Sequence, residues 1–184
     1  MKKIVVALAA VGAVVLTGCA PMSGHGSLDS TVSGSAQIEF HSKCSKAGNL
    51  VGSLEFQDRA AGVSLEGKVR DADYTTFDWP VGSGDCSTTP VDLAQFNGEP
   101  VSALAVPFTL KHCRTDCAGI ALVGAVDGGR THHNHAGRTA PGCDAMVPGV
   151  DYVIVALQGS SKSGYVNCGP LRRGGVEISV DAPQ

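Results

Sequence analysis

The chain has 184 residues, with 14 lysines and arginines against 17 aspartates and glutamates, and a formal net charge of −3. This length fits a single domain. An acidic balance lacks the basic face that nucleic acids require, so we predict no nucleic-acid partner.

The N-terminal segment is typical of an export signal. Lys2 and Lys3 precede an apolar run over residues 4–16, and small residues follow before Cys19. A basic start, an apolar stretch of about 7–15 residues and small residues before a cut define such a signal. A transmembrane helix needs ~20 apolar residues, which is more than this run provides.

Residues 16–19 read Leu-Thr-Gly-Cys and resemble a bacterial lipobox. The resemblance implies a cell-envelope lipoprotein, attached to the membrane by acyl chains such as palmitate on Cys19. Two or more chains suffice for stable anchoring. Residues 1–18 are then a signal peptide, and the mature chain keeps 12 basic and 17 acidic residues. The alternative is an ordinary secreted protein in which Cys19 is incidental.

Six cysteines remain when Cys19 is set aside as the lipid carrier. An even number in an exported domain predicts three disulfides, and the spacing leaves their pairing open. A zinc–thiolate site needs paired short spacings, and only Cys113 and Cys117 lie close together. The predicted disulfide cysteines are Cys44, Cys86, Cys113, Cys117, Cys143 and Cys168.

Residues 19–34 are rich in glycine and serine, and we interpret them as a lipidated flexible tether. About 15 such residues reach roughly 20 Å, which would hold the following domain off the membrane. From residue 35 the pattern changes to alternating apolar and polar residues, so we expect a β domain over residues 35–184.

Period-two alternation predicts half-buried strands along much of this domain. It is cleanest over residues 63–70, and a short break before this run predicts a hairpin. Two unbroken apolar runs suit strands buried on both faces, with Pro107 breaking the first run or placing it at an edge. The eight predicted strands cover residues 36–41, 49–56, 63–70, 101–106, 120–126, 152–157, 165–168 and 176–180, and residues 74–79 are a further candidate strand.

These runs give about eight strands and no amphipathic helix, so we predict an all-β fold. The 24 glycines fit many turns. The expected architecture is a single antiparallel β-sandwich or partly open barrel, stabilised by disulfides.

Three sets of short stretches stand out in this domain. They are residues 52–58 with the alternating strand after them, residues 126–129, and residues 149–152 with Gly164, Tyr165, Gly174, Val176, Glu177 and Ile178. Together they resemble a small accessory β-domain of secreted bacterial proteins, the post-COAP type. The resemblance implies a β fold more than a function, and it carries over no catalytic residues. The six cysteines and the connection over residues 80–100 depart from its pattern.

The most conspicuous polar cluster holds His132, His133 and His135. Imidazoles at this spacing can bind copper or zinc. The alternative is a solvated loop. A His-x-His pair also resembles copper–zinc superoxide dismutases, but the neighbouring zinc ligands of that enzyme have no counterpart here. Further ligands would come from His41, His112, Asp127 or Asp151.

Asp127 and Asp151 stand beside glycines at strand ends. Their oxygens could bind calcium, but the surrounding sequence has no calcium-loop pattern, and we expect them to cap turns. Tyr74, Phe77 and Trp79 are expected in the core, with a binding surface as the alternative.

No nucleophile motif, phosphate loop or dinucleotide fingerprint is present, so we assign no catalytic residue and no required cofactor. The sequence favours a binding or structural module over an enzyme. Its partners would be the membrane, through acylated Cys19, and an unidentified envelope protein or ligand. The alternative is a zinc- or copper-binding domain or metalloenzyme centred on His132, His133 and His135.

Overall fold

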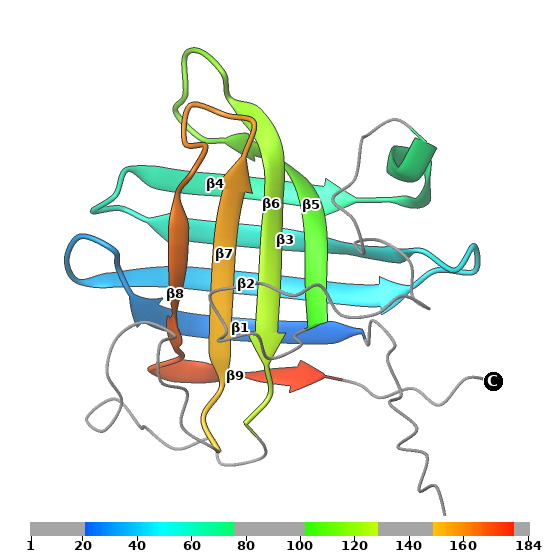
Figure 1. Ribbon diagram of the computed structural model, residues 1–184, viewed down its shortest axis with the longest axis horizontal. Helices are drawn as coiled ribbons and strands as arrows, with labels where there is room; N and C mark the ends of the chain where they lie inside the picture. The colour runs from blue at the N-terminus through cyan, green and yellow to red at the C-terminus, as the bar shows by residue number, and fades with distance from the viewer. Residues whose placement is uncertain (1–20, 76–101, 129–148, 179–184) are drawn as a thin grey trace, which may run out of the picture.

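The computed structural model describes residues 21–75, 102–128 and 149–178. These residues form nine strands in one antiparallel sheet, ordered β8-β7-β6-β5-β4-β3-β2-β1-β9 (Figure 1). The first eight strands follow one another as an up-and-down meander, and β9 returns to pair with β1. The prediction of an all-β, antiparallel fold is confirmed.

The strands agree with most of the predicted runs. One difference concerns residues 74 and 75. The sequence predicts that they begin a strand, but they belong to the 3-10 turn η1. Asp73 favours this turn, because its carboxylate accepts a hydrogen bond from the Arg70 N–H at 2.7 Å. The elements are β1 (Met22–Asp29), β2 (Ser35–Cys44), β3 (Leu50–Asp58), β4 (Val63–Val69), η1 (Asp71–Thr75), β5 (Ser102–Leu110), β6 (Ala118–Val126), β7 (Tyr152–Gln158), β8 (Val166–Pro170) and β9 (Arg173–Ile178).

The sheet curls into a half-barrel because β5 leaves β4. β5 pairs with β6 from Ser102 to Thr109, but it pairs with β4 only from Phe108 to Leu110. Pro107 stands where the pairing with β4 stops, and proline has no N–H to donate to a ladder. The strand itself continues through Pro107, so only its pairing with β4 is interrupted.

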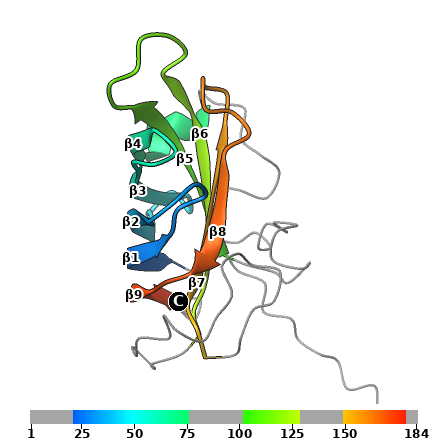
Figure 2. The same ribbon diagram turned by 90° about the vertical axis from the view of Figure 1, so that its left-hand side faces the viewer.

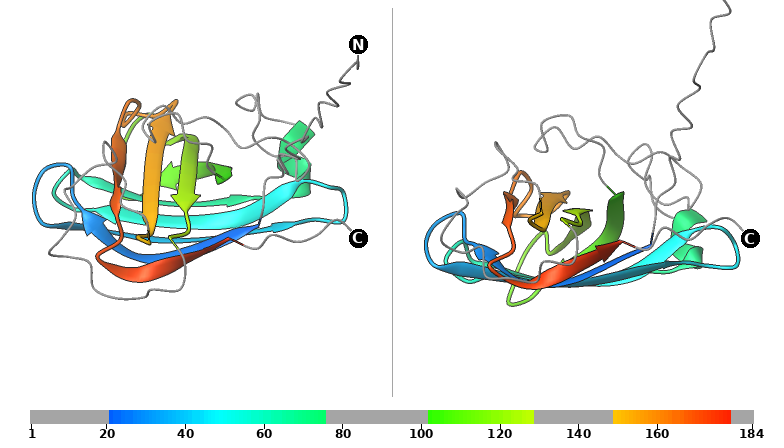
Figure 3. Two further views of the ribbon diagram at one scale, coloured as in Figure 1. Left: turned by 60° about the horizontal axis from the view of Figure 1, so that its bottom comes forward. Right: turned by 90° about the horizontal axis from the view of Figure 1, so that it is seen from below.

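Curling places β6, β7 and β8 across one face of β1–β4, as the views in Figures 2 and 3 show. β8 contacts β1, and β6 contacts β9. The main core fills the space between these two layers, with fully buried side chains such as Phe40, Phe56, Leu104, Val123 and Val155. Each such side chain contributes about 1.5–3 kcal/mol through removal from water.

A second apolar cluster lies on the other face of β5–β7. It includes Leu122, Val150, Tyr152 and Ile154, and Ile154 is fully buried. β6 and β7 therefore bury side chains on both faces. This explains their unbroken apolar sequences, which lack the alternation of β2 and β4.

The tether predicted over residues 19–34 is wrong for Met22–Asp29, which form β1 between β2 and β9. Its inward glycines are needed for close packing. A Cβ at Gly24 would lie 2.5 Å from the Phe40 ring, and one at Gly26 would lie 2.0 Å from the Arg173 carbonyl oxygen. Glycine-rich composition here reflects contact with neighbouring strands rather than flexibility.

Candidate functional site

Several predicted site residues lie outside the described residues, namely Cys19, Cys86, Cys143, His132, His133 and His135. The other four predicted disulfide cysteines can be placed. Cys113 and Cys117 form a disulfide with 5.5 Å between their Cα atoms, and Cys44 and Cys168 are also disulfide-bonded.

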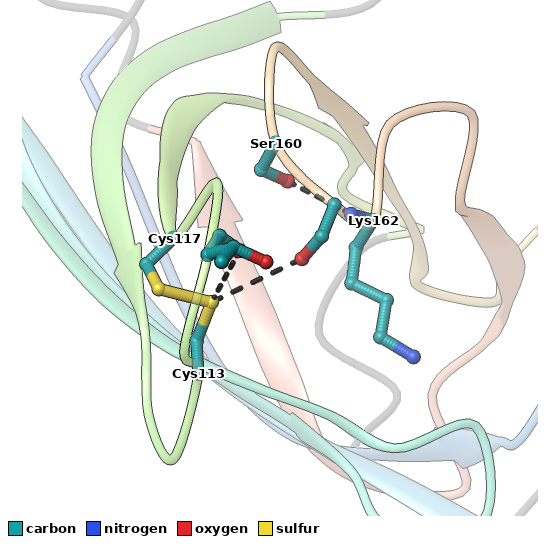
Figure 4. Close-up of a disulfide and its surroundings, with 6 residues drawn as sticks. Cys113, Cys117, Ser160 and Lys162 are labelled. Carbon is teal, nitrogen blue, oxygen red and sulfur yellow. Dashed lines mark hydrogen bonds between the residues drawn. A yellow bond between two sulfur atoms is a disulfide. The ribbon is translucent and has the colours of Figure 1, made fainter.

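The Cys113–Cys117 disulfide braces the loop between β5 and β6 (Figure 4). His112 and Asp116 in this loop have φ values of 58° and 51°, a conformation unfavourable for side-chain-bearing residues. The Asp116 carbonyl accepts a hydrogen bond from the Ser161 N–H at 2.8 Å, which joins the loop to the β7–β8 hairpin. The disulfide therefore closes the loop on itself, and the hydrogen bond from Ser161 joins the closed loop to the hairpin.

Asp151 caps the outer side of β9, the strand at one edge of the sheet. One carboxylate oxygen accepts the Gly128 N–H at 2.8 Å, and the other accepts the Val176 N–H at 2.9 Å. Asp127 accepts the Ile178 N–H at 3.4 Å. The sequence predicted that the two acids cap turns, whereas in the structure both accept amides of β9 that would otherwise remain open on an edge strand, and Asp151 also accepts the Gly128 amide.

Across residues 21–75, 102–128 and 149–178, no group of three or more histidine, cysteine, aspartate or glutamate side chains is arranged to hold a metal ion. His41 and His112, which the sequence offered as further ligands, are both exposed.

Asp58 is a fully buried carboxylate that joins three loops. It accepts hydrogen bonds from Ser30 Oγ at 2.7 Å, Tyr165 Oη at 2.8 Å, the Ala61 N–H at 3.1 Å and the Thr31 N–H at 3.3 Å. Burial raises the pKa of Asp58, but these hydrogen bonds together outweigh burial and hold it below the ordinary value. The pKa of Tyr165 is raised by burial and by its bond to Asp58.

The outer face of β2–β4 carries a row of three glutamates. The strand register places Glu39 opposite Glu55 and Glu55 opposite Glu66. Neighbouring strands lie about 4.8 Å apart, so the three residues span roughly 10 Å. All three are exposed. We call Glu39, Glu55 and Glu66 the glutamate row.

The row continues across the sheet to His25 on β1 and Thr109 on β5. Like charges directly opposite one another on neighbouring strands destabilise a sheet. Glu39 and Glu55 form no ion pair among the described residues, so a neutral side chain at either position is expected to stabilise this part of the sheet.

Two shallow grooves cross this face, with volumes of about 640 and 300 Å³, and they share Glu39 and Glu55. These volumes are comparable to ligand sites. The lining side chains that accompany the row are mainly polar. They include Ser53, Lys68 and Thr109 in the larger groove, and Gln37, Gln57, Ser64 and Lys111 in the smaller one.

The three glutamates differ in their partners. Glu66 forms an ion pair with Lys111 at 2.9 Å. The hydrogen bond and the charge of Lys111 lower the pKa of Glu66, and Glu66 raises the pKa of Lys111. Within the described part of the chain, Glu39 and Glu55 make no side-chain hydrogen bond or ion pair. These two carboxylates are available to a ligand.

No protein-family model, curated protein or solved structure matches this chain. Among the described residues, no helix has the length and hydropathy of a membrane span.

Proposed function

We propose that this chain is a bacterial cell-envelope lipoprotein, anchored through acylated Cys19, whose β domain binds a basic ligand at the glutamate row. The Leu-Thr-Gly-Cys sequence supports the anchor. The disulfide-bonded cysteines support an oxidising, extracytoplasmic location, because such bonds persist outside the cytoplasm.

The glutamate row is the observation that carries the binding proposal. Glu39 and Glu55 face each other on neighbouring strands. Within the described residues neither carboxylate makes a side-chain hydrogen bond or ion pair, and Glu55 interacts with Lys111 only through its charge. Places where a protein breaks a local rule of stability are often functional. A ligand with two or more positive charges would relieve this repulsion on binding. A segment rich in lysine or arginine from another envelope protein has this chemistry and can lie along an open groove.

Oligolysine is a suitable probe for this site. Residues 20–184 would be titrated with labelled pentalysine at low salt, since screening weakens exposed charge interactions. We expect Glu55→Gln to weaken binding by about fivefold or more, because it removes the central charge of the row. Glu177→Gln is the matched control. It removes the same charge from an exposed position on β9, three strands away along the sheet.

Equal affinity of the two variants would show only general attraction to an acidic protein and would refute the site. Mass spectrometry of the N-terminal peptide tests the anchor separately, since acyl groups on Cys19 add a defined mass.

The alternative function remains a zinc or copper site at His132, His133 and His135, on the basis of three histidines within four positions. Near-stoichiometric metal that is lost in a His133→Ala/His135→Ala double variant would support it.

A further inference from the structure

One end of the domain gathers three segments that are distant in sequence. They are the start of β1 at Met22, the β2–β3 turn over residues 45–49, and η1, and Figure 1 shows them on the same side of the molecule. Asp71 in η1 accepts hydrogen bonds from Ser45 Oγ at 2.6 Å and Asn49 Nδ2 at 3.0 Å, which fixes η1 to the turn. We call these three segments the proximal end.

We propose that the proximal end rests on the phospholipid headgroups, so that the domain has a fixed orientation on the membrane. The inference rests on the proposed acylation of Cys19. Two residues, Ala20 and Pro21, lie between Cys19 and Met22, so the Cα atoms of Cys19 and Met22 are three steps apart along the chain. An extended chain of three such steps spans at most about 11 Å. The headgroup layer of one leaflet takes up about 5–8 Å of this distance.

The connection cannot lengthen by releasing β1. Met22 pairs with Ile178 of β9, and its N–H donates to Ser42 Oγ of β2 at 2.8 Å. Gly24 and Gly26 are packed against Phe40 and Arg173 farther along the strand. Because β1 is bound on both sides, detaching it would break two ladders. The short connection therefore fixes the distance between the domain and the bilayer.

Charge does not determine this orientation. The proximal end carries Lys46, Asp71 and Asp73, and Lys43 and Arg70 are next to it in the chain, so cations and anions nearly balance. A long flexible tether would let such an end rotate freely, whereas a connection of two residues keeps it at the surface. The β1–β2 loop, at the other end of an eight-residue strand, then lies up to about 27 Å farther from the bilayer.

Lysine labelling can test the orientation in the full acylated protein. The protein would be added to vesicles of phosphatidylethanolamine and phosphatidylglycerol and treated with a membrane-impermeant acylating reagent, with mass spectrometry at each lysine. Lys46 lies in the β2–β3 turn and is exposed, while Lys111 lies beyond the far end of β5 with 42% of its side chain exposed. In solution Lys46 should react freely and Lys111 more slowly, because the Lys111 amine is paired with Glu66. Each lysine is therefore compared with itself between the two proteins described next.

The comparison variant carries about 15 glycine and serine residues inserted between Ala20 and Pro21, which adds roughly 20 Å of reach. On vesicles, we expect Lys46 to react at least about threefold more slowly in the native protein than in this variant, because headgroups exclude the reagent. Lys111 should react equally in both.

Vesicle flotation distinguishes failure of the proposed anchor from failure of the proposed orientation. A native protein that does not float is not acylated, which overturns both the anchor and the orientation. A native protein that floats, but whose Lys46 reacts as fast as in the insertion variant, keeps the anchor and overturns the orientation.

Discussion

Asp58, at the end of β3, and the glutamate row, on β2–β4, lie on opposite faces of the sheet and in opposite surroundings. Asp58 is fully buried and accepts four hydrogen bonds. Glu39 and Glu55 are exposed, and within the described residues they make neither a side-chain hydrogen bond nor an ion pair. A buried carboxylate requires such partners to remain charged, whereas an exposed carboxylate relies on water.

The comparison separates acids that build the fold from acids that can serve a ligand. The hydrogen bonds of Asp58 are all directed at loops of its own domain, so a ligand could reach it only by disrupting them. Glu55 has a strand neighbour of the same charge on each side. Removing Asp58 should therefore cost stability, while neutralising Glu55 should cost binding alone.

Asp58→Ala should have the largest effect on stability. It leaves Ser30, Tyr165 and two backbone N–H groups without their acceptor, and unsatisfied buried groups cost about 1–3 kcal/mol each before relaxation. We expect a loss of about 3 kcal/mol in the free energy of unfolding, measured by urea denaturation.

Tyr165→Phe gives a graded comparison, since it removes only one of the four hydrogen bonds and keeps the ring packed against Phe56. We expect it to cost about 1 kcal/mol. An Asp58→Ala variant no less stable than Tyr165→Phe would contradict the role of Asp58 in joining the loops.

The sequence predicted the fold class well because the sheet is built from clear hydrophobic patterns. Alternation in β2 and β4 indicates strands with one buried face, and the apolar runs of β6 and β7 indicate strands with two buried faces. β1 was missed because its inward positions include Gly24 and Gly26, so alternation is visible only at Met22 and Leu28. Only the positions of Phe40 and Arg173 show that glycine is required there.

The glutamate row could be predicted in part from the sequence. Once the β3–β4 turn is fixed at residues 59–62, antiparallel pairing must place Glu55 opposite Glu66. The position of Glu39 depends on the β2–β3 register, which the alternation alone does not determine. Asp58 could not be found in the sequence, because its partners Ser30 and Tyr165 lie 28 and 107 residues away.

The pH dependence of unfolding should reveal the same buried acid with a smaller effect. The pKa of Asp58 is lowered in the fold from its ordinary value of 3.8. Its contribution to stability is therefore complete above pH 4 and is lost as the pH falls through the lower folded value. Asp58→Asn does not titrate, so its stability should change less with pH below about 4 than that of the native protein.

Tyr165 affects the stability of the protein at alkaline pH. Its pKa is raised in the fold from 10.0, so its neutral form stabilises the protein below that pH and this contribution is lost as the pH rises above it. Tyr165→Phe should reduce the alkaline loss and leave the steepest part of the acid loss in place. Identical pH profiles for the native protein and both variants would show that this pair does not control the titration.

Glu55→Gln should give the smallest change in stability, and one of opposite sign. Relief of the repulsion from Glu39 and Glu66 should raise the free energy of unfolding by about 0.5 kcal/mol at low salt, and the gain should shrink as salt screens the charges. Glu177→Gln should be neutral, because its partner on β1 is Ser23 rather than another acid. A loss of stability in Glu55→Gln would mean that this carboxylate supports the fold as Asp58 does. A gain in the free energy of unfolding together with weaker pentalysine binding would show that the charge of Glu55 serves a ligand and destabilises the sheet.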